Sequence, residues 1–350
     1  MSTMIFSTVI LSVPTVIAAH ARQDAWLSVI LATGAGLLMA RLVTTLGLRF
    51  PDRTIFEYPA EILGRWPGKL VSCLYIFWLI HINAGVVRQF GEFLVAGFLP
   101  DTPLIVFTLA LVAVAAYAVR NGLEVFTRTN EIFFSLIILF LIISMLLTIK
   151  DVALHRLLPV GDAGVISIAK GAVVPAAWFG EIVTITALIP YLTRPRDAHR
   201  VAVGGVLVSG IVLLLVVIDA IILVGPDILD AINYSGLQKY RVVDIAGFLG
   251  RLEALVMVNW ITGGFVKVAF FYWATVLGIA QVMELKDYRP LVLPVGALIL
   301  GMSILNHEDV MDLQRFITLA FPPFVAVFAV VWPLLLLAAD LVRGKGRRSS

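Results

Sequence analysis

The length and composition of this chain of 350 residues indicate an integral membrane protein. Hydrophobic residues make up 60% of it and charged residues 14%, whereas a soluble domain carries about 25% charged residues. The formal charge of +3 does not indicate a nucleic-acid partner, because the basic residues lie in short loops between apolar runs rather than on one face.

Residues typical of enzymes and metal sites are few and scattered. The single cysteine, Cys73, lies in an apolar run and excludes an intrachain disulfide framework. The histidines show no metal-ligand spacing, and no hydrolase, kinase or phosphate-loop motif is present. We therefore expect that the protein is not an enzyme and that it binds neither a cofactor nor a metal ion. The five histidines are His20, His81, His155, His199 and His307.

Ten apolar segments are candidate spanning helices, each of which needs about 20 residues. They are Met4–Ala19, Ala25–Leu48, Leu70–Leu99, Thr102–Val119, Glu124–Ile149, Ile166–Leu192, Val201–Val224, Glu253–Met283, Leu291–Leu305 and Phe316–Leu341. The first is read as a span and not as a signal peptide, because no Lys or Arg precedes Arg22. The sequence thus predicts one all-α transmembrane domain over residues 1–350.

The loops between these segments predict that both ends are cytoplasmic. With the N terminus in the cytoplasm, sixteen basic residues lie on the cytoplasmic side and seven on the outer side. This distribution favours that orientation, because short cytoplasmic loops are enriched in Lys and Arg. Two longer loops carry apolar residues. Pro51–Gly68 is predicted to form a short amphipathic helix along the inner interface, and Gly225–Gly250 forms either a helical lid or an ordinary loop.

Two predicted helices contain possible interruptions, the first at Ser7-Thr8 and Pro14, the sixth at Pro175 and Gly180. Broken helices at mid-membrane form binding sites in many transporters, at corresponding positions of inverted repeats. Helices one and six occupy corresponding positions if the chain consists of two repeats of five spans, about residues 1–150 and 164–341. Because five is an odd number of spans, the second repeat then has the opposite orientation in the membrane. A plain kink remains the alternative, and it is the stronger reading for the first helix alone.

The sixth helix offers the best candidate site, because small residues, aromatic residues and an acid meet there at mid-span. We expect the binding of a small amino-acid-like molecule between the first and sixth helices, with Lys267 in the place of a coupling cation. The expected substrate-binding residues are Ser7, Thr8, Val9, Asn83, Ala177, Trp178, Phe179, Gly180, Glu181 and Asn259.

Charges within the spans need partners or a cavity, because each costs about 2.5–3.5 kcal/mol at a helix centre. Arg88 and Glu92 are four residues apart and can pair on one helix, as a structural pair or as a gate. Glu124 and Arg128 have the same spacing near the inner end. Lys267 lies near the centre of the eighth span and needs a partner on another helix.

Seven sequence runs, in order along nearly the whole chain, resemble the spore germination permease family. They are RQDAWLSV (Arg22–Val29), RFPDRTIFEY (Arg49–Tyr58), ILGRWPGKL (Ile62–Leu70), RQFGEFL (Arg88–Leu94), HRLLPV (His155–Val160), WFGEIVTITALIPYL (Trp178–Leu192) and RLEALVMVNWITGGFVK (Arg251–Lys267). That family supplies the B subunits of GerA-type germinant receptors, within the amino acid–polyamine–organocation superfamily.

The resemblance implies a ten-helix LeuT-like bundle with 5+5 inverted repeats and broken helices one and six. It also implies the inner membrane of an endospore, A and C partner subunits, contact with membrane lipid, and sensing of amino acids or similar germinants. The sequence departs from the family at Ser7-Thr8-Val9, where relatives show a Gly-Thr-Gly-like break, and it starts closer to its first helix.

Two rival functions share this fold, an autonomous amino acid secondary transporter and an ion channel opened by germinant. Fold does not separate them. Of the three functions, we first expect that the chain is a subunit of a germinant receptor.

Overall fold

The computed structural model describes residues 1–231 and 249–344, without the side chains of residues 10–12, 151, 230–231 and 249–255. All regular elements of these residues are helical. The predicted loop Gly225–Gly250, with its lid interpretation, lies largely outside the described residues, as does the C-terminal tail from residue 345.

Each of the ten predicted spans corresponds to a helix or a helical series. The main helices are α1 (Ser2–Ala21), α2 (Ala25–Gly47), α4 (Arg65–Gly97), α5 (Leu104–Asn121), α6 (Leu123–Leu147), α7 (Gly164–Gly180), α8 (Ala198–Val224), α11 (Leu249–Val282), α12 (Val292–Leu305), and the series α13 (Val310–Arg315), α14 (Phe321–Ala326) and α15 (Trp332–Arg343). Two short helices, α3 (Tyr58–Leu63) and α9 (Pro226–Ala231), lie between them.

Most of these helices are suited to a bilayer. Eight helical stretches of the described residues are long and apolar enough to cross a membrane, and the shorter apolar stretch Arg289–Leu305 adds α12. The first of the eight, Val13–Gly47, includes both the end of α1 and all of α2. The protein is therefore a multi-pass membrane protein, as predicted.

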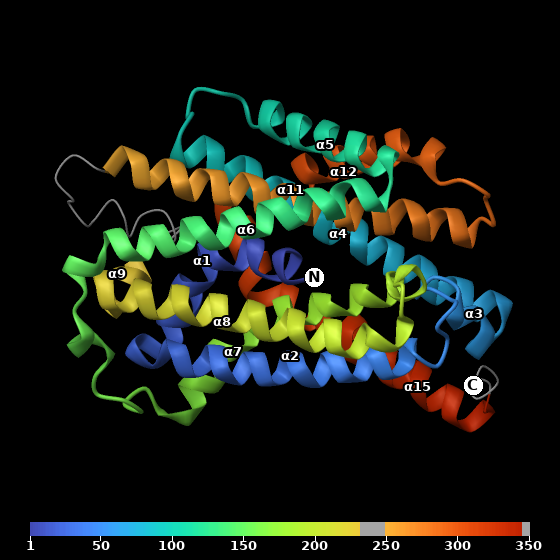
Figure 1. Ribbon diagram of the computed structural model, residues 1–350, viewed down its shortest axis with the longest axis horizontal. Helices are drawn as coiled ribbons and strands as arrows, with labels where there is room; N and C mark the ends of the chain where they lie inside the picture. Colours follow the sequence, from blue (N-terminus) through green and yellow to red (C-terminus); the bar gives the residue numbers. More distant parts are fainter. Residues whose placement is uncertain (232–248, 345–350) are drawn as a thin grey trace.

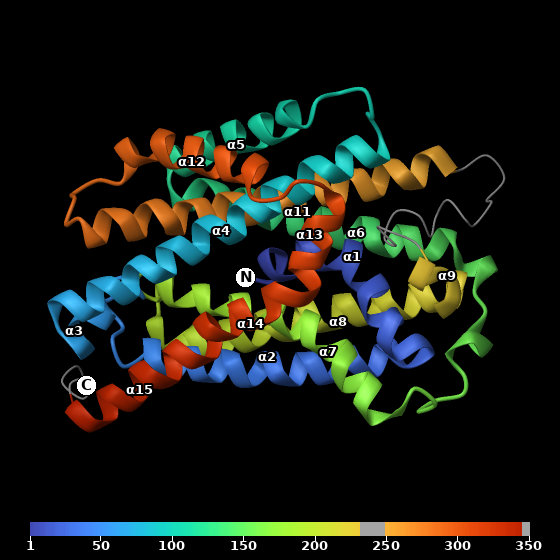
Figure 2. The same cartoon turned by 180° about the vertical axis from the view of Figure 1, so that it is seen from behind.

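The helices lie mostly along one axis (Figure 1). In both views α3 and the C-terminal end of α15 lie at one end of the bundle, while α9 lies at the other. The N terminus lies near the middle. Figure 2 shows α13, α14 and α15 crossing one face of the bundle as a diagonal series.

Glycines set two of the tight connections. Gly64, between α3 and α4, and Gly122, between α5 and α6, both have a φ of 100°, a conformation that L side chains rarely adopt. Gly68 at the start of α4 has no room for a side chain, because a Cβ there would lie 2.1 Å from Ala60 Cα of α3. The helix predicted in Pro51–Gly68 is thus present as α3, but it packs on the protein, with Tyr58 and Ile62 buried.

The interruption expected in the first helix at Ser7-Thr8 is wrong. α1 is α-helical from Ser2 to Ala21, with Pro14 inside it. The residues at this place include no glycine, so they keep ordinary helical dihedrals, and a single internal proline removes only one backbone hydrogen bond.

The interruption expected in the sixth helix is present. α7 ends at Gly180, and the chain continues as a tighter 3₁₀ segment, η4, from Glu181 to Ala187. The last series has a second kind of irregularity, since π-helical turns η8 (Phe316–Ala320) and η9 (Val327–Val331) flank α14. π-turns inside helices are rare and occur frequently at functional sites.

Candidate functional site

The end of α7 is fixed by close packing against the last helical series. A Cβ on Gly180 would lie 2.8 Å from Val325 Cγ1 of α14 and 3.1 Å from Ala329 Cβ of η9. Only glycine permits this approach. The change from α to 3₁₀ geometry follows immediately, and it turns Glu181 into the interior of the bundle, where its side chain is fully buried.

Lys267 of α11 is the partner of this acid. Its Nζ lies 2.8 Å from Glu181 Oε2, and neither side chain is exposed. The Lys267 ammonium also lies 5.7 Å from the centre of the Phe271 ring, within the range of a cation–π contact. The structure therefore pairs the two charges that the sequence left without partners in the membrane.

Thr8 of α1 joins this pair to the end of α7. Lys267 Nζ donates a hydrogen bond to Thr8 Oγ1 at 2.8 Å, and Trp178 Nε1 donates to the same oxygen at 3.0 Å. A hydroxyl oxygen can accept two hydrogen bonds, so both lone pairs are used. We call Thr8, Trp178, Glu181 and Lys267 the central polar site.

The second carboxylate oxygen of Glu181 is left over. Within the described residues, Glu181 Oε1 has no hydrogen-bond partner. A buried acceptor without a partner costs about 1–3 kcal/mol, and more when the group is charged. Such an atom at a helix break is suited to a ligand or a water molecule that donates a hydrogen bond.

A small cavity adjoins Glu181 and Trp178. It leaves about 30 Å³ for the centres of water molecules, and one water needs about 10–15 Å³ on this measure. Gln89 of α4 lines one side of the cavity, and Phe316 and Phe321 of the last series line another. The cavity has room for about two waters but not for an amino acid, so the site is closed in this conformation.

The other expected site residues lie at varied distances from this centre. Asn83 of α4 is buried and donates from Nδ2 to the Val268 carbonyl at 3.4 Å, directly beside Lys267. Phe179 packs instead against α2, where a Cβ on Gly36 would lie 2.7 Å from Phe179 Cβ. Asn259 is eight residues from Lys267 on α11, about 12 Å along the helix, too far to share a small ligand with it.

The remaining expected residues contribute backbone or apolar surface. Ser7 faces α11, where a Cβ on Gly263 would lie 2.8 Å from Ser7 Cβ, and its hydroxyl points back to the Met4 carbonyl at 3.5 Å. Val9 and Ala177 are buried. Sequence reasoning missed Gln89, Phe316 and Phe321 as cavity residues; the Pro322-Pro323 pair that follows Phe321 was the available signal of an irregular helix.

The two predicted ion pairs differ in their surroundings. Arg88 Nε lies 2.6 Å from Glu92 Oε1 in a largely buried place. Arg88 also donates to the carbonyl of Ile304, in the last turn of α12, and to that of Glu308, between α12 and α13. It therefore ties α4 to the start of the last series. Glu124 and Arg128 also lie 2.6 Å apart, but both side chains are about three-quarters exposed.

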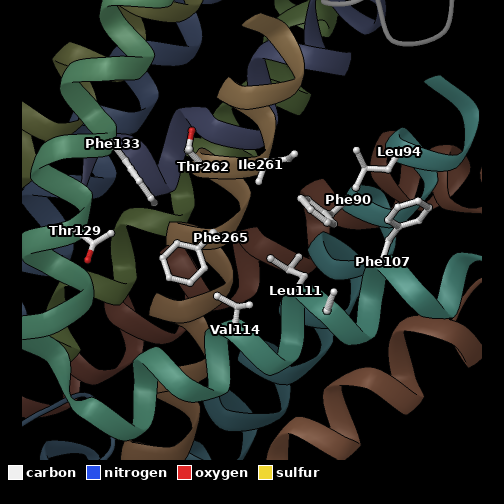
Figure 3. A pocket seen from close by; sticks show the side chains of 11 residues that line it. Phe90, Leu94, Phe107, Leu111, Val114, Thr129, Phe133, Ile261, Thr262 and Phe265 are labelled. Carbon is white, nitrogen blue, oxygen red and sulfur yellow. The ribbon is translucent and has the colours of Figure 1, made fainter. Parts of the chain in front are cut away.

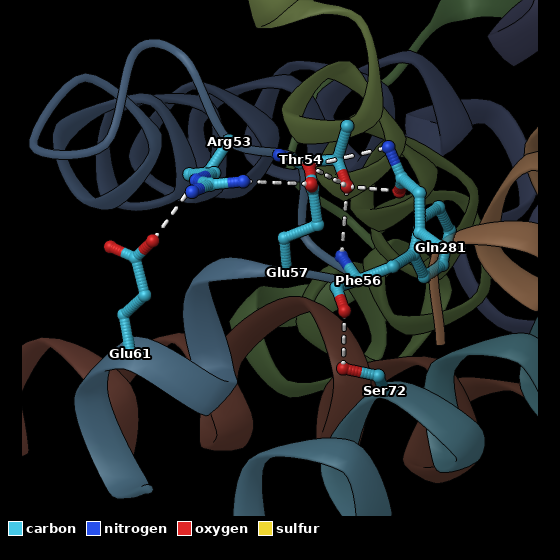
Figure 4. Close-up of polar contacts among 7 residues, drawn as sticks. All are labelled: Arg53, Thr54, Phe56, Glu57, Glu61, Ser72 and Gln281. Atoms are coloured by element: carbon cyan, nitrogen blue, oxygen red, sulfur yellow. Dashed lines mark hydrogen bonds and ion pairs between the residues drawn. The ribbon is translucent and has the colours of Figure 1, made fainter. Parts of the chain in front are cut away.

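A second polar cluster lies at the α3 end (Figure 4). Thr54 Oγ1 donates to Gln281 Oε1 of α11 at 2.5 Å, and Gln281 Nε2 donates to Glu57 Oε2 at 3.2 Å. Arg53 pairs with Glu57 and with Glu61 of α3. We call these five residues the α3-end cluster. Within the described residues, no group of His, Cys, Asp and Glu side chains could hold a metal ion.

Three comparisons relate this chain to known proteins. A family model described as spore germination protein matches residues 1–310. Spore germination protein KB of Bacillus subtilis (strain 168) is 29% identical over 335 residues, covering 94% of this chain and 90% of the relative. Spore germination protein YndE of the same organism is 25% identical over 332 residues, covering 93% and 89%.

The fold comparison gives a LeuT-like architecture. The crystal structure of MhsT in complex with L-phenylalanine has a TM-score of 0.63 at 11% sequence identity, with 97% of each chain covered. At this identity the likeness shows the fold alone. The matched families and folds are those of membrane germination and transport proteins rather than of enzymes.

Proposed function

Since this chain belongs to the spore germination protein family, we propose that it is a membrane subunit of a spore germinant receptor. It binds an amino acid or a similar small germinant at mid-membrane, at the central polar site, and signals germination. The observation that carries this proposal is the buried Glu181–Lys267 pair on Thr8, which leaves Glu181 Oε1 unpartnered at a helix break beside a cavity.

The chemistry of this pair matches a zwitterion. An ammonium group can pair with the Glu181 carboxylate, and a carboxylate can pair with Lys267 and the Trp178 N–H, since charge-assisted hydrogen bonds are the strong ones. A ligand with both charges thus replaces the internal pair without leaving either side chain uncompensated. Without ligand, the internal pair satisfies Lys267 and keeps the site closed.

The last helical series is the part that opens. Phe316 and Phe321 line the small cavity, the Phe321 ring lies 4.8 Å from the Trp178 ring, and π-turns stand on both sides of α14. Entry of an amino acid requires these rings to move away from Trp178. This movement changes the surface of the bundle, which the A and C subunits of the receptor sense.

Binding by the purified protein tests the proposal. Isothermal titration with a panel of amino acids is expected to find at least one ligand. Glu181→Gln and Thr8→Val are expected to weaken its binding about tenfold or more, as loss of a hydrogen bond to a charged group of about 1.5–3 kcal/mol implies. Glu124→Gln, in the exposed pair of α6, serves as the matched control and binds as the wild type does.

Two results would contradict the proposal. One is normal binding by both site variants, when size-exclusion chromatography shows that they are folded. The other is a wild-type protein that binds none of the amino acids in the panel.

An amino acid secondary transporter is the alternative function, and the shared fold with the L-phenylalanine complex of MhsT favours it. Gradient-driven accumulation of an amino acid by the purified protein in liposomes would support the transporter. Binding without accumulation would support the receptor subunit.

The proposed setting is the inner membrane of an endospore, with the C terminus and the α3 end on the side of the spore core. The N terminus, which was also expected on that side, lies near the middle of the bundle. Basic residues at the α3 end, such as Arg49, Arg53, Arg65 and Lys69, support this orientation. We also propose that residues 1–150 and 164–341 are inverted repeats, since each half contains five helical spans. Labelling of single cysteines introduced at the two ends, from one side of sealed vesicles, tests the orientation.

A further inference from the structure

A second, larger pocket opens on the side of the bundle between α4, α5, α6 and α11 (Figure 3). We call it the lateral pocket. Its volume is about 400 Å³, within the range of about 300–1,000 Å³ typical of ligand sites. It shares no lining residue with the central polar site.

The lining of the lateral pocket is suited to hydrocarbon. Aromatic rings from α4, α6 and α11 (Phe90, Phe133 and Phe265) point into it. The two hydroxyls in the lining are already used, since Thr129 donates to the Val125 carbonyl at 2.9 Å and Thr262 to the Val258 carbonyl at 2.8 Å. A charged occupant would lose its hydration and would find no charged partner and no free hydroxyl donor in the lining.

The mouth of the pocket is continuous with the lipid-facing surface. Val114 on α5 lines the pocket and is 55% exposed, and Ile132 on α6, beside the lining residue Phe133, is 65% exposed. The floor is deep, because Phe90 and Leu111 are each only 6% exposed. Phe90 also closes the pocket towards α11, where a Cβ on Gly264 would lie 3.2 Å from its ring.

The size of the pocket selects among apolar occupants. A helix of another chain is about 10 Å wide, and it needs about 30 Å of length to cross the bilayer. The volume of such a helix is several times the volume of the pocket. A single hydrocarbon chain is narrow enough to pass between α5 and α6 and reach Phe90. The bilayer supplies such chains at high concentration on the exposed side.

We propose that the lateral pocket is a binding site for an acyl chain of a membrane lipid. The chain enters from the bilayer past Val114 and ends against Phe90 and Leu111. Phe265 and Lys267 are two residues apart on α11, so they point to nearly opposite faces. A bound chain therefore supports the back of the helix whose front carries Lys267, and it holds α11 in place between α4 and α6.

Photocrosslinking tests this site in the full-length protein. The probe is a phosphatidylcholine with a diazirine midway along one acyl chain, mixed into phosphatidylglycerol vesicles that contain the purified protein. After irradiation, crosslinked peptides are quantified by mass spectrometry. In the wild type, crosslinks are expected at the buried floor residues Phe90 or Leu111, as well as at the lipid-facing residue Leu139, which is 49% exposed.

Variants that fill the mouth of the pocket give the decisive comparison. Ala110→Phe, in the lining of α5, is expected to reduce the floor crosslinks at least fivefold and to leave those at Leu139 unchanged. Ala113→Phe places the same side chain on an exposed position of α5 outside the pocket, and it is expected to behave as the wild type does. Val114→Trp is the second filling variant, for use if Ala110→Phe does not fold.

The proposal is overturned if the wild type shows no crosslinks at Phe90 or Leu111. It is equally overturned if a folded filling variant leaves them unchanged. With a photoreactive amino acid in place of Phe133, crosslinks to another protein chain, without lipid crosslinks at the floor, would overturn the proposal and assign the pocket to a partner helix instead.

Discussion

The central polar site and the α3-end cluster use similar groups in different surroundings. Each combines oppositely charged side chains with a threonine hydroxyl that bridges separate segments of the chain. In the centre, Glu181 and Lys267 are both 0% exposed. At the α3 end, Arg53 is 52% exposed and Glu57 26% (Figure 4).

Solvent decides how much each contact contributes. Exposed ion pairs are worth about 0–1 kcal/mol because water screens them. In a buried pair the loss of one partner leaves an uncompensated charge, which costs about 3–5 kcal/mol. The comparison therefore predicts that a substitution in the centre affects the whole bundle, whereas one at the α3 end affects a local connection.

The largest effect is expected from Lys267→Met. It leaves the Glu181 carboxylate buried and unpaired, so the protein should lose about 3–5 kcal/mol of stability. Thermal unfolding in detergent, followed by tryptophan fluorescence, measures the loss. The double variant Glu181→Gln/Lys267→Met removes both charges and should recover most of the stability. If Lys267→Met alone unfolded at the wild-type temperature, this result would contradict the large cost expected for an unpaired carboxylate in the buried centre.

An intermediate effect is expected from Thr54→Val in the α3-end cluster. Thr54 is buried, donates to Gln281 and accepts from the Phe56 backbone N–H at 3.2 Å. Removing its hydroxyl leaves buried groups unpaired and should cost about 1–3 kcal/mol. Thr129→Val is the matched control, since the Thr129 hydroxyl donates to a carbonyl of its own helix. Equal unfolding temperatures for the two variants would contradict the prediction that the Thr54 hydroxyl contributes more to stability than the Thr129 hydroxyl.

The smallest effect is expected at Glu284, whose side chain is 62% exposed at the same end. Lys69, by its hydrogen bond and its charge, and then Arg65 hold the pKa of Glu284 below its ordinary value of 4.5. The stability from this carboxylate is therefore complete above pH 4.5 and is lost as the pH falls through the lowered pKa. The difference in unfolding temperature between wild type and Glu284→Gln should shrink over this range. A difference that grows on acidification would reverse the sign of the shift.

Salt provides the control for the Glu284 prediction. At about 1 M salt the screening length falls to about 3 Å, so the difference between wild type and Glu284→Gln should nearly vanish at neutral pH. The same salt should leave the loss caused by Lys267→Met almost unchanged, because salt does not reach the bundle centre.

The helical pattern of the sequence was a good guide to local features. It predicted the positions of the helices, the interruption after Gly180, and the pairs Arg88–Glu92 and Glu124–Arg128. These depend on residues within one or two helical turns of each other, which periodicity resolves. The Ser7-Thr8 interruption was wrong because polar residues in a helix do not by themselves end it.

Contacts between helices were not accessible in the same way. The sequence singled out Glu181 and Lys267 but did not pair them, and it did not predict that Thr8 accepts hydrogen bonds from both Lys267 and Trp178. It also placed Phe179 in the site, whereas that side chain packs on Gly36. Each of these depends on how one helix is rotated about its axis relative to another.

Composition and periodicity alone thus determined that this chain crosses a bilayer many times and that one helix is interrupted beside an acid, since burial in hydrocarbon constrains every span separately. Only the tertiary structure decided which charges meet, because the crossing and rotation of α1, α7 and α11 bring together side chains that lie far apart in sequence. It alone revealed the lateral pocket as well, because a hollow between four helices leaves no periodic signal in any one of them.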